Sequence, residues 1–348
     1  MTNPTSKLSL GLGLGTKNQA GQWLEVYFPC PWTGLTAGDL KALSPLLDSG
    51  DNNQSVDLDS AKLDQLIAAL GTNKAASELS ALAADFKASN QEAVLVLSHH
   101  DQEPLDVPQI YLNLQLLSRR HVKPHGISLQ GVFGKLTNLA WTNQGPVELD
   151  KLDAKRLETR RKGETLVVRL VDKFPPMTDY VVPSGVRIGD ATRIRLGAYL
   201  GEGTTVMHEG FVNFNAGTMG ESMVEGRISA GVVIGKGSDL GGGCSTMGTL
   251  SGGGNVIISV GENCLIGANA GVGIGLGDRC TVEAGLYVTA STKVNLLDDK
   301  GNVVGQVKAK DLSGQSDLLF RRNSLSGAVE CLSNQTAIEL NAELHKNN

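Results

Sequence analysis

One spacing dominates the second half of this chain: an aliphatic side chain recurs at every sixth position. The recurrence is interrupted and then resumes, and its members are Ile188, Ile194, Leu200, Val206, Val212, Ile228, Ile234, Leu240, Val260, Ile266, Val272, Leu276, Val282, Val288 and Val294. A helix requires apolar spacing near 3.6 and a half-buried strand requires spacing of 2, so a period of six fits neither. It fits a coil of three short strands, in which each hexapeptide forms one flat side and buries one aliphatic residue. The sequence therefore predicts a parallel β-helix over residues 181–294.

Glycine keeps a fixed place in this repeat. It follows the aliphatic residue at positions 189, 201, 235, 241, 261, 267, 273 and 277. Gly accommodates the strained dihedrals of tight corners, and small inward residues allow successive coils to stack closely. An accidental spacing in an ordinary glycine-rich β domain would not keep so many positions in phase.

Residues 1–150 lack the sixfold spacing and are predicted to form a separate α/β domain. Helical spacing of apolar residues marks 60–70, 75–86 and 108–120, and β-like runs lie at 22–28 and 93–97. The N-terminal domain is therefore expected to have a core of its own.

Two further segments flank the coil. Residues 151–180 form a connecting segment that contains Pro175 and Pro176, which cannot continue a helix. Residues 295–348 are predicted to contain a hairpin that turns at 298–302 and a terminal helix at 328–345. That helix is expected to cap the open end of the coil.

Charge and cysteine content limit the classes of function. A net charge of −5 and a pI near 5.7 argue against a broad nucleic-acid surface but allow a local basic patch for a small phosphorylated ligand. The apolar stretch 8–15 is too short for a membrane span. The five cysteines are odd in number and lack close spacing, which argues against a disulfide framework and a zinc site. A reducing cytoplasm is the expected location.

Two intervals of the repeat are irregular. Ile228 follows Val212 by sixteen positions, and Val260 follows Leu240 by twenty. Neither number is a multiple of six, so a loop is predicted to leave the coil in each interval. Loops on a rigid scaffold are where binding and catalytic groups concentrate.

The first interval contains an acidic and a basic residue just before the repeat resumes. Glu225 lies three residues before Ile228, where the coil is expected to hold its carboxylate firmly, and a carboxylate there can orient or deprotonate an amine. Arg227 can pair with an anionic ligand. The alternative is a solvated Glu/Arg pair at a corner of the coil.

The second interval is rich in glycine from 241 to 254, which would let a ligand approach the backbone closely. This stretch is not a phosphate-binding Walker loop. The similar run 231–237 has one residue too few between its glycines and lacks Ser or Thr after Lys236.

His208 is the only histidine of the coil, which excludes a zinc site built from several histidines. A general-base role for His208 stays open. The adjacent Glu209 can face its symmetry mates on a threefold axis and share a hard cation with them.

Basic residues gather again after the coil. Lys308, Lys310, Arg321 and Arg322 are followed by Asn323 and Ser324, a set suited to the phosphates of a nucleotide-bearing cofactor. The alternative is a solvated charged face.

Taken together, these motifs resemble the long form of the tetrahydrodipicolinate N-succinyltransferase family over nearly the whole chain. The matching stretches are MHEGFVNFNAG at 207–217, MVEGRIS at 223–229, MGTLSGGG at 247–254, EAGLYVT at 283–289, LFRRNS at 319–324, VKPHG at 122–126 and WTN at 141–143. The resemblance implies a left-handed parallel β-helix, an exception to the usual right-handed crossover, and a homotrimer with active sites between neighbouring coils.

The resemblance also implies a reaction and its residues. The reaction is succinyl transfer from succinyl-CoA to the amino group of ring-opened tetrahydrodipicolinate, on the diaminopimelate and lysine biosynthesis route. Glu225 matches the family's catalytic position. The positions that match succinyl-CoA contacts are Arg227, Gly242, Ser245, Ala268, Glu283, Ala284, Ser291, Lys308, Arg321, Arg322, Asn323 and Ser324. Glu209 matches one magnesium-ligand position, whereas Thr192 stands where the actinobacterial branch has the companion carboxylate.

Two other functions are compatible with a β-helix. One is an acetyltransferase acting on another amine or hydroxyl group with His208 as the base. The other is a non-catalytic scaffold, which would show regular outward rows without irregular intervals. The positions of Glu225 and of the glycine-rich stretch favour the enzyme.

Overall fold

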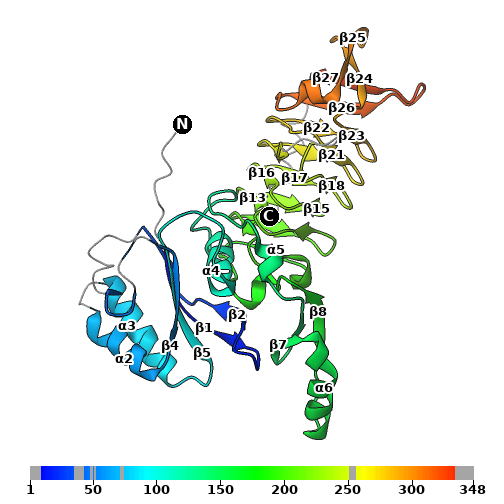
Figure 1. The fold of residues 1–348 in the computed structure, drawn as a ribbon. Coiled ribbons are helices and arrows are strands. Elements are labelled where there is room, and N and C mark those ends of the chain that lie inside the picture. Colours follow the sequence, from blue (N-terminus) through cyan, green and yellow to red (C-terminus); the bar gives the residue numbers. More distant parts are fainter. Residues whose placement is uncertain are drawn as a thin grey trace. The chain divides into compact units, whose positions relative to one another are not determined.

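The computed structural model describes residues 9–34, 43–47, 50, 52–70, 74–250 and 256–333. Within these ranges the chain forms two compact units (Figure 1). The first contains the described residues up to Leu116 together with Gly126–Pro175, and the second contains Leu117–His125 and the described residues from Pro176 onward. In the described part of the chain, no helix combines the length and the apolar character that a membrane span needs.

The first unit is built around an antiparallel sheet in the order β2-β1-β5-β4. Its strands are β1 (Ser9–Lys17), β2 (Trp23–Tyr27), β4 (Gln54–Leu58) and β5 (Glu92–Ser98), and the short β3 (Trp32–Thr33) also pairs with β1. Three helices accompany it: α2 (Ser60–Ala69), α3 (Lys74–Lys87) and α4 (Val107–Ser118). The helices and β-like runs expected in this region are therefore present.

Alternation along β1 explains how its two faces are covered. Leu10 and Leu12 belong to a buried cluster with Leu66 of α2 and Ala83 of α3, on the side of the sheet where Figure 1 shows these helices. On the other face, Gly11 lies so close to Phe28 and to Leu112 of α4 that a Cβ atom would approach their side chains to within 2.9 Å. Leucine on one face and glycine on the other thus set the helix packing.

A second, smaller sheet completes the first unit. It has the order β7-β6-β8 and consists of β6 (Leu139–Thr142), β7 (Gly145–Glu148) and β8 (Val168–Asp172). The short helix α5 (Val132–Lys135) precedes it, and the turn η1 (Leu149–Lys151) leads into α6 (Leu152–Arg161) between β7 and β8. Trp141 donates its indole N–H to the carbonyl of Asp172 at 2.9 Å, which ties β6 to β8.

The second unit is a parallel β-helix with three faces. Face 1 stacks β9 (Arg187–Ile188), β11 (Thr204–Val206), β14 (Ser222–Val224), β17 (Asp239–Leu240), β20 (Leu265–Ile266) and β22 (Thr281–Val282). Face 2 stacks β12 (Phe211–Val212), β15 (Arg227–Ile228), β18 (Ser245–Thr246), β21 (Gly271–Gly273) and β23 (Tyr287–Thr289). Face 3 stacks β10 (Tyr199–Leu200), β13 (Gly217–Thr218), β16 (Val233–Ile234) and β19 (Ser259–Val260). The turns η2 (Met177–Asp179) and η3 (Ala191–Arg193) lie at its beginning.

Except for the half-buried Ile188 in the first coil, the predicted aliphatic residues form the core of this β-helix. Val206 lies in register with Val224, Val224 with Leu240, and Leu240 with Ile266, and the most exposed of these four side chains has 1% of its surface accessible. Each coil therefore buries its side chains against those of the coils before and after it. This confirms the hexapeptide interpretation.

The first irregular interval is not a loop, and the prediction of one there was wrong. Val212 and Ile228 are direct partners in adjacent coils. The inward positions between them are Thr218 and Val224, so the corner after Val224 is two residues shorter than a normal one. The sequence pattern missed this continuity because Thr218 is not aliphatic, although it is fully buried.

The second irregular interval does contain a loop. Thr246 continues the inward series six residues after Leu240, and the chain then leaves the coil before Val260. Thr249 and Ile257 form an antiparallel bridge at the base of this excursion, and the amide of Leu250 donates to the carbonyl of Val256 at 2.9 Å. The loop is confirmed, and residues 251–255 within it lie outside the described ranges.

The C-terminal segment closes the coil with strands. The expected hairpin is present as β24 (Lys293–Leu297) and β25 (Val303–Lys308), and it is followed by the turn η4 (Ala309–Leu312). Next, β26 (Leu318–Arg322) pairs in parallel with β22 and extends face 1 by one rung. The last described strand, β27 (Val329–Ser333), lies between β26 and β24.

The beginning of the predicted terminal helix is therefore wrong. Residues 329–333 form β27, because they pair on both sides with strands that are distant in sequence. The remainder of the predicted helix, 334–345, lies outside the described residues.

Replacing Ile234, which is fully buried on face 3, tests the stacked core. Ile234→Ala removes packing against both neighbouring coils and is expected to lower the free energy of unfolding by about 3 kcal/mol. Ile257→Ala is the matched control, because Ile257 is 46% exposed, and it should cost about 0.5 kcal/mol. Chemical denaturation measures both values; equal losses would contradict the assignment of Ile234 to the core.

Candidate functional site

The candidate site lies along one edge of the β-helix, where face 1 turns into face 2. We call this the 1–2 edge; its corner segments are 207–210, 225–226, 241–244, 267–270 and 283–286. Backbone hydrogen bonds tie each corner to the coil above: Glu225 N donates to Leu240 O at 2.8 Å, Gly241 N to Ile266 O at 2.7 Å and Gly267 N to Val282 O at 2.8 Å. The predicted residues Glu209, Glu225, Gly242, Ala268, Glu283 and Ala284 all lie on this edge.

Glu225 occupies the shortened corner between β14 and β15. Its backbone carbonyl accepts from the amide of Gly243 at 3.2 Å, and its side chain is half-buried. A Cβ atom on Gly242 would lie 3.6 Å from Oε2 of Glu225. The missing side chain at Gly242 therefore leaves room beside the carboxylate, where a reacting group can approach.

Arg227 lies next to this corner on face 2. Its Nη2 donates to Oγ of Ser245 at 2.8 Å, and its backbone amide donates to the carbonyl of Cys244 at 2.8 Å. Its side chain is exposed. The structure thus brings together three predicted residues from two adjacent coils, namely Glu225, Arg227 and Ser245.

Cys244 is buried beneath these residues and is not a nucleophile at neutral pH. Mainly through burial, the pKa of its thiol is raised to about 12; the positive charge of Arg227 opposes this rise and the negative charge of Glu225 adds to it. The thiolate is the reactive form of cysteine, so this thiol is inert at ordinary pH.

Further along the 1–2 edge, Glu283 holds the strand that bears the predicted basic residues. Oε2 of Glu283 accepts from the backbone amide of Arg322 at 2.6 Å. In the same corner, the amide of Gly285 donates to the carbonyl of Ala268, in the preceding corner, at 2.8 Å. The Arg321–Ser324 segment is therefore attached to the end of this edge.

Ser291 and Lys308 lie together elsewhere, at the end of face 2. The amide of Ala309, next to Lys308, donates to the carbonyl of Thr292, next to Ser291, at 2.8 Å. Lys308 pairs with Lys293, two residues after Ser291, so both predicted residues lie in this hairpin region and not in the row of corners on the 1–2 edge.

Within one chain, the described residues that were expected to bind magnesium do not form a complete ligand set. Glu209 and His208 are exposed, and Arg193 donates to the backbone carbonyl of Glu209 at 2.9 Å. Thr192 donates its hydroxyl to Asp190 at 2.7 Å, and this bond lowers the pKa of Asp190. Across the described ranges, no three His, Cys, Asp or Glu side chains are grouped so that they could hold a metal ion.

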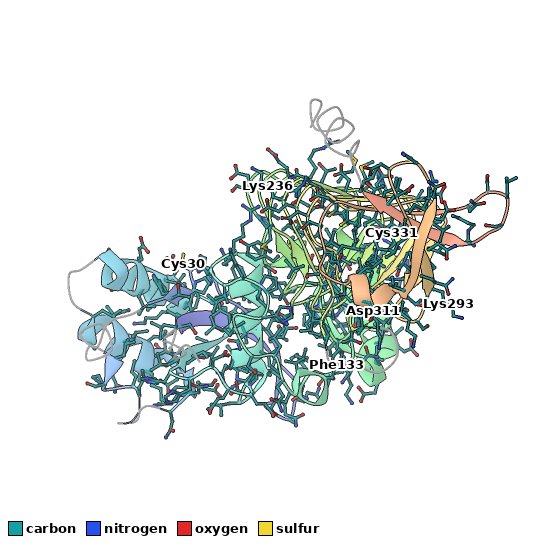
Figure 2. The ribbon with its side chains drawn as sticks, turned by 90° about the horizontal axis from the view of Figure 1, so that it is seen from above. Cys30, Phe133, Lys236, Lys293, Asp311 and Cys331 are labelled. Carbon is teal, nitrogen blue, oxygen red and sulfur yellow. The ribbon has the colours of Figure 1, made fainter. Side chains whose placement is uncertain are left out.

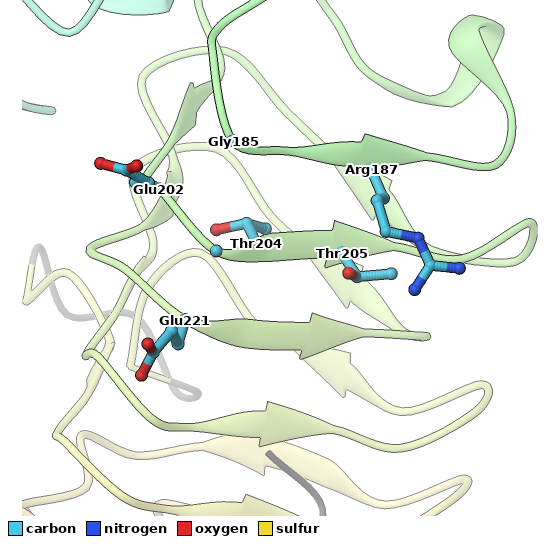
Figure 3. A pocket seen from close by; sticks show the side chains of 7 residues that line it. Gly185, Arg187, Glu202, Thr204, Thr205 and Glu221 are labelled. Carbon is cyan, nitrogen blue, oxygen red and sulfur yellow. The ribbon is translucent and has the colours of Figure 1, made fainter. Parts of the chain in front are cut away.

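Two further features were not predicted from the sequence. A pocket of about 300 Å³ opens on face 1 near its first coils, with Arg187, Glu202, Thr205 and Glu221 among its lining residues (Figure 3). No sequence pattern identifies this pocket, because the corner residues that line it resemble those of the other coils. None of the residues predicted for the active site lines it.

The segment Leu117–His125, which carries the VKPHG stretch, is attached to the first coils. Arg120 donates to the carbonyls of Leu200 at 2.5 Å and Ser184 at 2.8 Å. The backbone amide of His125 donates to Oδ1 of Asn215 at 2.8 Å. The VKPHG stretch therefore contacts the first coils of the β-helix and helps to hold them in place.

Two family descriptions match parts of the chain. "Hexapeptide repeat of succinyl-transferase" matches residues 257–290, and "Tetrahydrodipicolinate N-succinyltransferase middle" matches residues 136–175. The first match, together with the structural neighbour described next, supports the left-handed form of the β-helix. The fold and these matches thus define a transferase of the hexapeptide-repeat class.

Comparison with whole proteins gives the family. The chain is 58% identical over 98% of its length to the 2,3,4,5-tetrahydropyridine-2,6-dicarboxylate N-succinyltransferase of Vibrio cholerae, which is covered to 99%, and 59% identical over 98% of its length to that of Pseudomonas putida, covered to 98%. A crystal structure of a putative 2,3,4,5-tetrahydropyridine-2-carboxylate N-succinyltransferase from Campylobacter jejuni has a TM-score of 0.86 and 33% identity, with 97% of this chain and 96% of that chain covered. The chain belongs to the tetrahydrodipicolinate N-succinyltransferase family.

Thiol labelling of the folded protein tests the burial of the cysteines. Cys30 is exposed and should be alkylated quickly at pH 8, whereas Cys244 and Cys331 are buried, with pKa values raised to about 12. Figure 2 labels Cys30 and Cys331. Peptide mass spectrometry after a short exposure to iodoacetamide measures this, with the unfolded protein as the control. Rapid labelling of Cys244 in the folded protein would contradict the inert thiol.

Proposed function

We propose that this protein transfers the succinyl group of succinyl-CoA to the amino group of ring-opened tetrahydrodipicolinate. The products are N-succinyl-2-amino-6-oxopimelate and CoA, in diaminopimelate and lysine biosynthesis in the cytoplasm. The observation that carries the proposal is the carboxylate of Glu225, held at a shortened corner beside the bare backbone of Gly242, in a chain that belongs to this family.

The reaction forms one bond and breaks another. The amine nitrogen attacks the thioester carbonyl, a C–N bond forms, the C–S bond breaks, and the amine loses a proton while the leaving sulfur gains one. Glu225 can accept that proton, orient the amine through its charge, or carry the acyl group transiently, because all three roles need a carboxylate in the same place.

The turn that faces Glu225 supplies a candidate donor for the thioester oxyanion. The amides of Gly241, Gly243 and Cys244 donate to the carbonyls of Ile266, Glu225 and Gly241. In this fully described turn, the Gly242 amide has no such bond. We assign it to the developing oxyanion, a role in which one donor is worth roughly 10²–10³ in rate.

The other predicted residues are proposed to bind the donor. Arg227 and Ser245 lie beside Glu225, and Ala268, Glu283 and Ala284 continue the 1–2 edge. The Arg321–Ser324 segment supplies positive charge for the phosphates. Ser291 and Lys308 are proposed contacts from the end of face 2.

We also propose a homotrimer in which a neighbouring coil completes the cleft. The 1–2 edge of one chain is open, and holding an amine beside a thioester can contribute roughly 7–11 kcal/mol to the reaction through orientation. A second β-helix would supply the opposite wall of the cleft. No step of the proposed mechanism uses magnesium.

Glu225→Gln tests the central residue. The substitution keeps the size of the side chain but removes the charge, so we expect a trimer of three times the 36.6 kDa chain mass in light scattering and a loss of most turnover, about 10²-fold or more. Cys244→Ala, at the adjacent buried position, should leave turnover within about twofold, because the thiol is inert at neutral pH. Near-normal turnover of Glu225→Gln would remove Glu225 from the mechanism.

A comparison of acyl donors separates this function from its rivals. Thiol release is expected with succinyl-CoA and the dicarboxylic amine, and at a much lower rate with acetyl-CoA. A preference for acetyl-CoA that depends on His208 would support an acetyltransferase instead. No thiol release with either donor would favour the scaffold.

A further inference from the structure

Glu330 is a buried carboxylate that lies outside the predicted site. It belongs to β27, opposite Arg321 of β26 on one side and Asn295 of β24 on the other. Its side chain is only 7% exposed. A charge removed from water is costly unless it is paired and hydrogen-bonded, so the partners of Glu330 indicate why it is there.

Both oxygens of Glu330 bind side chains of the predicted donor site. Oε2 accepts from Nε of Arg321 at 3.0 Å, and Oε1 accepts from Nδ2 of Asn323 at 2.8 Å. The two partners lie on the same strand end and flank Arg322. One buried carboxylate thus fixes two of the four residues in the Arg321–Ser324 segment.

Asn323 also forms hydrogen bonds with the turn between β26 and β27. Its Oδ1 accepts from the amides of Leu325 and Ser326, each at 3.0 Å. Its backbone amide donates to the carbonyl of Ala328 at 2.8 Å. Asn323 therefore links the carboxylate to the backbone of the whole turn.

The bond from Arg321 to Glu330 uses Nε and leaves the terminal nitrogens as the donors for an anion. The Arg321 side chain is 44% exposed, in contrast to the buried Glu330. A guanidinium held through Nε presents a fixed fork, and such a fork matches a phosphate group.

We propose that Glu330 is a positioning residue for the nucleotide end of the acyl donor. It orients Arg321 and Asn323 to receive a phosphate group of succinyl-CoA, and it does not touch the donor itself. This inference rests on the proposed function, because it requires a donor that carries phosphates.

Glu330→Gln tests the proposal through donors with and without phosphate. The glutamine keeps the volume and can accept from Asn323, but it cannot offer the charged acceptor that Arg321 requires. We expect the KM for succinyl-CoA to rise about tenfold and kcat to stay within about twofold. With a succinyl thioester of pantetheine, which has no phosphate, both constants should match those of the unaltered protein.

Asp317→Asn is the matched control, because Asp317 lies just before β26, the strand that contains Arg321. Its two oxygens accept from Nε and Nη2 of Arg279 at 2.6 and 2.7 Å, an ion pair outside the predicted donor site. Asp317 has φ 62°, which Asn tolerates. This variant should leave both donors unaffected, which separates the loss of an ion pair from the loss of positioning.

Three outcomes would overturn the inference. An equal loss of activity with both donors would show that Glu330 has a general structural role, and the midpoint of thermal unfolding would then fall as well. An unchanged or lower KM for succinyl-CoA in Glu330→Gln would show that the carboxylate does not orient its neighbours. Absence of turnover with succinyl-CoA in the unaltered protein would refute the proposed function, and this inference with it.

Discussion

The stacking of one coil on the next is the constraint on which the β-helix depends. Each coil donates its backbone amides to the carbonyls of its neighbour and buries its inward side chains against theirs, as Val224 does between Val206 and Leu240. A single coil could bury little by itself, so the β-helix is stable only as a series. Its edges are consequently rigid, and a corner residue is fixed by the coils on both sides.

This rigidity accounts for the character of the candidate site. Glu225 lies where a coil is two residues shorter than its neighbours, so no flexible segment separates its carboxylate from the core residues Val224 and Ile228. Gly242, in the adjacent coil, leaves the space beside it open. Preorganised groups of this kind need little rearrangement during the reaction, which is the usual source of electrostatic catalysis.

Local patterns predicted the coil well and its exceptions poorly. The aliphatic positions revealed themselves because burial selects for them, whereas Thr218 and Thr246 occupy the same inward places and were missed. Their hydroxyl groups are satisfied inside the core: that of Thr218 bonds to the hydroxyl of Thr204 at 2.7 Å, and that of Thr246 donates to the carbonyl of Arg227 at 3.1 Å.

Residues 329–333 were mistaken for a helix because their conformation is set by pairing with β24 and β26. Spacing and resemblance predicted Glu225 and Arg227 as site residues, but the proposed role of Glu330 depends on a cross-strand neighbour that no sequence pattern reveals.

The parallel stacking also fixes distances along the β-helix, because each stacked strand adds the same rise. From the rung of Glu225 to that of Arg321, face 1 advances by four strands, β17, β20, β22 and β26, whatever number of residues each coil consumes. At about 4.8 Å per strand this amounts to roughly 19 Å. Insertions such as the one after Thr246 do not change this distance, because it depends only on the number of stacked strands. A donor molecule that contacts both Glu225 and Arg321 must be long enough to span it.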